Sequence, residues 1–303
     1  MKKVLSLLIV FIIVISAFIG CDKKIEEKDY SLAIGVVVTE NLAKSKITET
    51  VASIVTDADG KIVLCRLDCV DYTATYGEDG KLSTTAPASK VSLGAAYGTM
   101  PAGTWSEQSA ALESYVVGKT QSEVAAIALE GGVVTDAELK ASCSVNVADL
   151  LKAIDNAFKS EHKTGFKSAA ESFTAGLSTI ATVKDTTAEG VANAKLTATY
   201  TGTVLADGAV VATILDTAEA ELKGIVDGAA SSISFSGTKR ELGEAYGTMP
   251  TGTWFAQVDA YAKAAEGKTA DDIATLASEG VAGCTIYAGE YKAGIEAAVK
   301  AAR

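Results

Sequence analysis

Apolar and β-branched residues alternate with polar ones in several short segments of this chain. Alternation of this kind predicts strands with one buried face. In each half an Asp-Gly pair separates two such segments, at Asp59-Gly60 and at Asp207-Gly208. This pair is the strongest short-range signal for a β-hairpin. The predicted strands cover residues 32–39, 48–56, 61–71, 195–205 and 209–216.

After the strands of each half, the apolar period changes from two to about 3.6, which predicts helices. Thr104 with Glu107, and Thr120 with Glu123, form capping boxes that open helices of about 12 and 9 residues. Asn146 is a candidate N-cap for a further helix. The predicted last helices of the two halves cover residues 147–158 and residues 289–303.

One stretch of the sequence occurs almost unchanged twice. Residues 93–105 and 242–254 differ at only two of thirteen positions, at an offset of 149. The offset falls to 141 further on, so the second copy has lost eight residues, which we interpret as part of a loop. The copies, residues 31–160 and 161–303, are each long enough for a core, and we expect each to fold alone. Strands before helices in each copy indicate an α+β fold: two tandem homologous domains, each an antiparallel sheet followed by packed helices.

The N-terminus carries an export signal. Lys2 and Lys3 precede an apolar run over residues 4–19, which ends at Gly20-Cys21. Residues 1–20 are therefore predicted to be a lipoprotein signal peptide, with Cys21 as the lipidated residue. An uncleaved anchor helix is the alternative. Residues 21–30 are predicted to form a charged tether. Both alternatives place the protein at the cell membrane, on the extracytoplasmic face.

Composition excludes several classes of function. The formal net charge is −11, and −13 without Lys2 and Lys3, so nucleic-acid binding is disfavoured. The only histidine is His162, which excludes His-based catalysis, His-rich metal sites and haem attachment; no metal site is predicted. No nucleophile elbow, P-loop or dinucleotide fingerprint occurs in the sequence. An electron carrier or a binding protein is favoured over a hydrolase or a transferase.

The cysteines of the body divide into two pairs. Cys65 and Cys69 share a strand face about 13 Å apart, too far to bridge each other, and packing is the favoured interpretation. Cys143 and Cys284 occupy the same place in both copies. A disulfide between these two is conceivable but disfavoured.

A hydroxyl residue follows each of these two cysteines, Ser144 in the first copy and Thr285 in the second. Both hydroxyls are expected just ahead of a helix, where free N–H groups accommodate a phosphate. The alternative is that they only help to cap these helices.

The order of hairpin, middle helices and small-residue turn resembles the bacterial FMN-binding domain of exported electron-transfer flavoproteins. That family carries Asp-x-x-Ser-Gly-Ala-Thr, and a flavin transferase esterifies the FMN phosphate to the Thr. Residues 282–285 (Ala-Gly-Cys-Thr) align with the Ser-Gly-Ala-Thr of this motif, and residues 141–144 (Ala-Ser-Cys-Ser) are a weaker match. The resemblance implies cofactor contacts from Cys143, Ser144, Gly283, Cys284 and Thr285, with covalent FMN on Thr285.

Two functions follow from these observations. The first is a membrane-tethered lipoprotein that carries flavin and passes electrons to redox partners, with Tyr97, Trp105, Tyr246 and Trp254 as candidates to stack on the isoalloxazine ring. The same aromatic residues are also compatible with simple core packing. The second function is a surface binding or structural lipoprotein without a cofactor.

Overall fold

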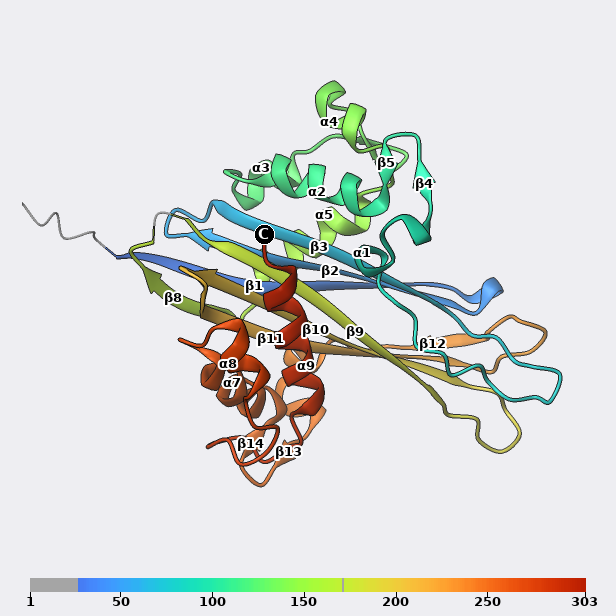
Figure 1. Ribbon diagram of the computed structural model, residues 1–303. Helices are drawn as coiled ribbons and strands as arrows, with labels where there is room; N and C mark the ends of the chain where they lie inside the picture. The colour runs from blue at the N-terminus through green and yellow to red at the C-terminus, as the bar shows by residue number, and fades with distance from the viewer. Residues whose placement is uncertain (1–26, 171) are drawn as a thin grey trace, which may run out of the picture.

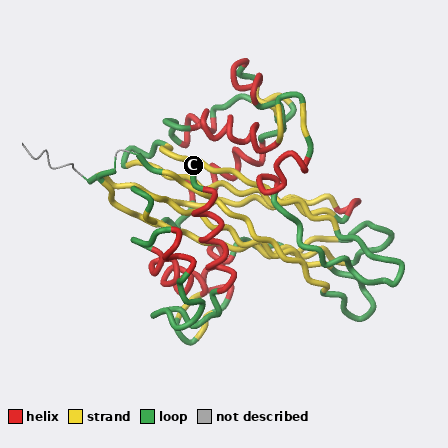
Figure 2. Tube along the Cα trace, in the orientation of Figure 1, coloured by secondary structure: helices red, strands yellow, loops and turns green. Residues whose placement is uncertain are grey.

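The computed structural model describes residues 27–170 and 172–303; the predicted signal peptide and Cys21 lie outside them. Figure 1 shows two antiparallel sheets stacked face to face, with a layer of helices on the outer face of each, and Figure 2 separates strands from helices by colour. The predicted mixed fold with antiparallel sheets is confirmed. In spatial order the first sheet is β3 (Ile62–Thr73), β2 (Lys46–Asp57), β1 (Lys28–Asn41) and β8 (Thr164–Ser168), and the second is β12 (Ser232–Ser234), β11 (Ala209–Lys223), β10 (Ala194–Ala206) and β9 (Thr174–Asp185).

The two halves have matching helices and small hairpins. The hairpin β4 (Thr99–Met100) and β5 (Gly103–Thr104) matches β13 (Thr248–Met249) and β14 (Gly252–Thr253). The helices of the first half are α1 (Lys90–Leu93), α2 (Trp105–Val116), α3 (Gln121–Ala125), α4 (Ala137–Ser142) and α5 (Ala148–Lys159), and those of the second are α6 (Lys239–Leu242), α7 (Trp254–Ala265), α8 (Ala270–Ala274) and α9 (Gly289–Ala301).

The largest core lies between the sheets and belongs to both halves. Alternate residues of β1, such as Leu32 and Ile34, join one cluster with Leu196 and Ile214 of the second sheet. The residues between them, such as Ala33, face α5 in a separate outer core. Because each sheet covers the inner face of the other, neither half can bury that face alone. The shared core opposes the expectation that each copy folds by itself.

Two further contacts join the halves. Strand β8 follows the predicted boundary at residue 161, yet it pairs with β1 and so extends the first sheet. At the other end of the chain, Arg303 Nη2 lies 2.7 Å from the buried carboxylate of Glu113 on α2. Strand β1 also begins at Lys28, so residues 28–30, predicted as tether, belong to the sheet.

Local sequence signals explain where several helices begin, and the structure corrects two other predictions. Thr104 and Thr120 form the predicted capping boxes of α2 and α3, although α3 spans only five residues. The N-cap of α5 is Val147; the predicted cap, Asn146, instead accepts a hydrogen bond from the Ala148 N–H at 3.0 Å. The segment shortened in the second copy is not a loop in the first. It contains α4 and β7 (Val133–Val134), which pairs with β6 (Leu129–Glu130) immediately before the segment.

Helix α5 lies directly on β1 because Gly35 has no side chain. A Cβ at Gly35 would collide with the backbone of α5 at Ala153 and Ala157. Gly176 on β9 allows α9 the same close approach at Ala298. Both last helices are therefore held against the sheets by backbone contact, which fixes the turns that precede them.

Candidate functional site

The two predicted attachment hydroxyls are held by matching glutamines. Gln108 on α2 accepts hydrogen bonds at Oε1 from the Ser144 N–H (2.7 Å) and hydroxyl (3.1 Å). Gln257 on α7 accepts from the Thr285 N–H (2.9 Å) and hydroxyl (2.8 Å). Both glutamines are fully buried. They were missed in the sequence, although the offset of 149 between them is the same as that of the repeated segment.

These hydroxyls do not cap the helices that follow. Helix α5 begins at Ala148 and α9 at Gly289, and each hydroxyl residue lies three positions before the N-cap, which is Val147 or Ala288. Thr285 is exposed and Ser144 is half-buried. The expected placement of a phosphate directly at the helix N-terminus therefore differs from the observed geometry.

The turns that carry the hydroxyls have different backbones in the two halves. Gly283 has a φ of +82°, the left-handed conformation that glycine adopts at no steric cost. Ser142, its counterpart, is the last residue of α4. Cys143 and Cys284 are both buried and free, so no disulfide joins the halves there. Only the second half keeps the glycine turn that the resemblance implies.

A polar and aromatic cluster lies beside the repeated segment of the first half, and we call it cluster 1: Lys46, Asp71, Lys90, Tyr97 and Trp105. Lys90 Nζ lies 3.3 Å from Asp71 Oδ2 and over the rings of Tyr97 (4.9 Å) and Trp105 (5.6 Å). Lys46 Nζ lies 3.1 Å from the same carboxylate, and the Tyr97 hydroxyl donates to it at 3.2 Å.

The second half contains the same arrangement, which we call cluster 2: Lys195, Glu219, Lys239, Tyr246 and Trp254. Lys239 Nζ lies 3.0 Å from Glu219 Oε1 and over the rings of Tyr246 (4.6 Å) and Trp254 (5.4 Å). Lys195 pairs with the same carboxylate, and the Tyr246 hydroxyl donates to it at 3.3 Å. All of these contacts recur, so the duplication preserved a three-dimensional arrangement as well as a sequence.

The electrostatics of the clusters suit permanent ion pairs. Burial lowers the pKa of Lys90, but the neighbouring Cys69, Asp71 and Tyr97 outweigh burial and hold it above its ordinary value. Burial raises the pKa of Asp71, and Lys90, Thr48 and Lys46 reverse this to a net lowering. The pKa values of Lys239 and Glu219 shift in the same directions for the same reasons. Each cluster therefore holds the loop that contains its tyrosine against the sheet, through side chains that stay charged across neutral pH.

The clusters leave the two tryptophan rings unsuited to stacking on a flavin. Trp105 and Trp254 are only 5% and 2% exposed, and a lysine ammonium lies over each ring. The Thr285 hydroxyl is accessible, but it donates to Gln257 and lies 3.0 Å from the Thr251 hydroxyl. Trp105 and Trp254 therefore do not fit a flavin ring stacked on them, and neither hydroxyl lies at a helix N-terminus that would hold the phosphate.

The remaining candidate residues have structural surroundings. Cys65 and Cys69 are buried and free in the outer core beneath α2. His162 stands between α5 and β8, with its ring 4.7 Å from that of Phe255. Within residues 27–170 and 172–303 no group of three or more His, Cys, Asp or Glu side chains is placed to hold a metal ion. In the same ranges no helix is long and apolar enough to cross a bilayer.

Comparison with known proteins adds no assignment. No protein-family model matches the chain, and neither a curated protein nor a solved structure does. The internal repeat is therefore the main guide to function, because it shows which residues the chain keeps twice.

Proposed function

We propose that this protein is a binding lipoprotein of the extracytoplasmic surface, anchored through lipidated Cys21 and working without a cofactor. We further propose that its halves are two homologous domains that present the same loop to one partner. The observation that carries the proposal is an exposed loop with the same sequence twice: Ala-Tyr-Gly-Thr-Met-Pro at residues 96–101 and 245–250.

Packing accounts for the tyrosine and the methionine of these loops but not for their exposed positions. Gly98 has a φ of +130°, so a backbone requirement explains that glycine and its counterpart. Thr99 and Pro101 are exposed in the first half, and Thr248 and Pro250 are exposed in the second. Exposed positions usually tolerate substitution at little cost in stability. Their retention supports a role in contact with a partner, while clusters 1 and 2 hold the loops in place.

The position of the loops favours a partner with repeated units. Figure 1 shows β4 and β5 beside α2 at one end of the first helical layer, and β13 and β14 at the far side of the second layer, on opposite sides of the paired sheets. Two equal loops facing different directions suit a polymer of the cell envelope better than one small molecule. Where a polymer chain reaches both loops at once, the overall affinity exceeds that of either loop alone by about 10² to 10⁴.

The test is co-sedimentation of the full chain, in detergent, with isolated peptidoglycan sacculi. Alanine at both Thr99 and Pro101 is expected to weaken binding about 100-fold, and adding alanine at Thr248 and Pro250 is expected to abolish it. Glu244→Ala is the matched control, because the first copy has Ala95 there. No sedimentation of the wild type, or equal sedimentation of all variants, contradicts the proposed binding.

A flavin-carrying electron-transfer protein remains the second candidate. Two observations favour it: Gly283 keeps the left-handed turn, and the Thr285 hydroxyl beside it is exposed. In this alternative Thr285 would hold the FMN after transfer by a flavin transferase, the flavin would supply redox chemistry, and the protein would orient it toward redox partners. An absorption spectrum after co-expression with a flavin transferase separates the two candidates, because only the second produces a flavin band.

A further inference from the structure

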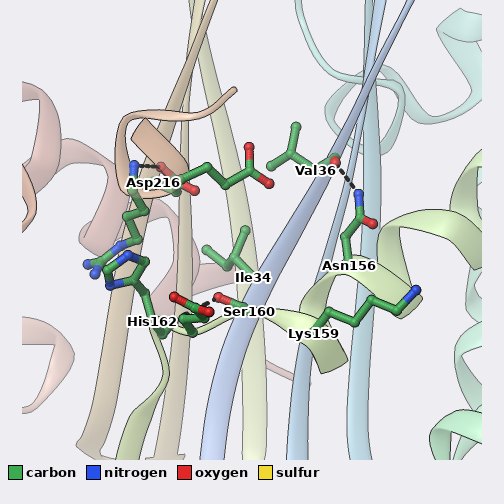
Figure 3. Close-up of a pocket in the computed structure, with 10 residues that line it drawn as sticks. Ile34, Val36, Asn156, Lys159, Ser160, His162 and Asp216 are labelled. Atoms are coloured by element: carbon green, nitrogen blue, oxygen red, sulfur yellow. Dashed lines mark hydrogen bonds between the residues drawn. The ribbon is translucent and has the colours of Figure 1, made fainter. Parts of the chain in front are cut away.

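A cavity of about 240 Å³ lies where the two halves meet, at the junction of α5 and β8. Figure 3 shows Ile34 and Val36 of β1 at its back, with the end of α5 on one side and Asp216 of β11 on the other. The hydrophobic strand residues form an apolar wall. The polar lining residues are Asn156, Lys159, Ser160, Glu161, His162, Asp216, Arg240 and Glu241.

The cations around the cavity are already paired. Arg240 binds Asp259 through both terminal nitrogens and donates from Nε to the Leu215 carbonyl. Lys159 pairs with Asp155 one turn earlier on α5. Their charges are thus compensated by acidic side chains that are not part of the cavity lining.

The carboxylates are less fully compensated. Asp216 is buried and accepts backbone N–H donors from Thr217 at 2.7 Å and from Arg240 at 3.2 Å. Glu241 accepts the Thr238 N–H at 2.8 Å through one oxygen. Within the described ranges Glu161 forms no ion pair and is exposed at the cavity mouth. The cavity therefore has excess negative charge and free acceptors.

Two charged residues of this lining, Arg240 and Glu241, have no charged counterpart in the first half of the molecule. At the offset of 149, Arg240, Glu241 and Asp259 correspond to Val91, Ser92 and Ala110. Only Asp216 keeps an acidic counterpart, Asp68, which caps α1 in the same way. The aspartate is thus common to both halves, whereas Arg240 and Glu241 are particular to the second.

We propose that this cavity binds a small aliphatic ammonium ion, such as a short diamine. The carboxylates of Asp216, Glu161 and Glu241 would accept its N–H groups, and Ile34 and Val36 would contact its methylene chain. A net charge of −11 on the chain favours the approach of a cation over an anion. The volume limits the ligand to a few methylene groups.

Isothermal titration of the full chain in detergent with butane-1,4-diamine tests the site. We expect one saturable site, weakened about tenfold or more by Glu161→Gln and by Asp216→Asn. Glu161 is exposed, so its variant will fold even if Asp216→Asn does not.

Two controls identify the cavity. Asp68→Asn changes the equivalent aspartate of the other half, and Glu130→Gln removes an exposed charge elsewhere; neither is expected to weaken binding. Inorganic phosphate is titrated in parallel. Absence of diamine binding, phosphate binding in its place, or equal diamine affinity in wild type and Glu161→Gln overturns the proposal.

Discussion

The most informative prediction concerns Glu49, a carboxylic acid in the core between the sheets. Glu49 lies on β2, and the hydroxyl of Tyr200 on β10 donates to its Oε2. Both side chains are fully buried, and Glu49 Oε1 has no hydrogen-bond partner within the described residues. Burial raises the pKa of Glu49 from 4.5 to about 8, against the lowering effect of the Tyr200 hydrogen bond. The folded protein therefore keeps Glu49 protonated at neutral pH.

The sign of the effect on stability follows from this shift. Below pH 4.5 Glu49 is protonated in both the folded and the unfolded chain, so it makes no pH-dependent contribution to the free energy of unfolding. As pH rises, the unfolded chain releases this proton while the folded chain retains it. The free energy of unfolding then falls by about 1.4 kcal/mol per pH unit. The fall ends near pH 8, at a total of about 5 kcal/mol.

Glu49→Gln removes this titration while keeping the shape and polarity of the side chain. Urea denaturation at pH 5, 7 and 9 measures the free energy of unfolding of both proteins. The difference between variant and wild type should grow in favour of the variant, by about 2 to 3 kcal/mol between pH 5 and pH 7. Other titrating groups, such as Asp216 with a pKa raised by burial to about 6, affect both proteins and cancel in the difference.

Glu40→Gln is the matched control, because Glu40 is exposed at the end of β1 and should show no such trend. A difference between Glu49→Gln and wild type that stays constant from pH 5 to pH 8 would refute the reasoning. It would mean that Glu49 is ionised or hydrated in the folded state.

Three further predictions concern the anchor, the cofactor and the shared core. Palmitate labelling should mark the wild type and be lost in Cys21→Ala; label that persists in the variant excludes lipidation at this residue. Intact-mass measurement after co-expression with a flavin transferase should show no FMN-sized addition if the cofactor-free proposal is right. One addition, removed by Thr285→Ala and kept in Ser144→Ala, supports the flavoprotein instead. When residues 28–168 and 172–303 are expressed separately, each fragment should bind a hydrophobic dye and aggregate, because the inner face of its sheet is uncovered. Mixing the two fragments should restore a soluble complex. Two well-folded, soluble fragments would contradict this prediction.

The sequence alone determined the local elements of this protein. Alternation located five of the long strands but not β9, Asp-Gly pairs located two hairpins, and Thr104 with Glu107 located the start of α2, since each of these signals depends on neighbouring residues. The duplication likewise predicted that the halves would have matching parts. The start of α5 was placed one residue too early, since Asn146 binds an adjacent N–H without being the N-cap.

Only the tertiary structure decided how the halves combine and what surrounds the candidate residues. Alternation shows that a strand has a buried face, but not which partner covers it, so the shared core and the pairing of β8 with β1 were not predictable. The contacts of Thr285 with Gln257, and of Lys239 with Glu219 and Trp254, join residues distant in sequence. Such contacts are set by the packing of helices on sheets, which no local pattern encodes.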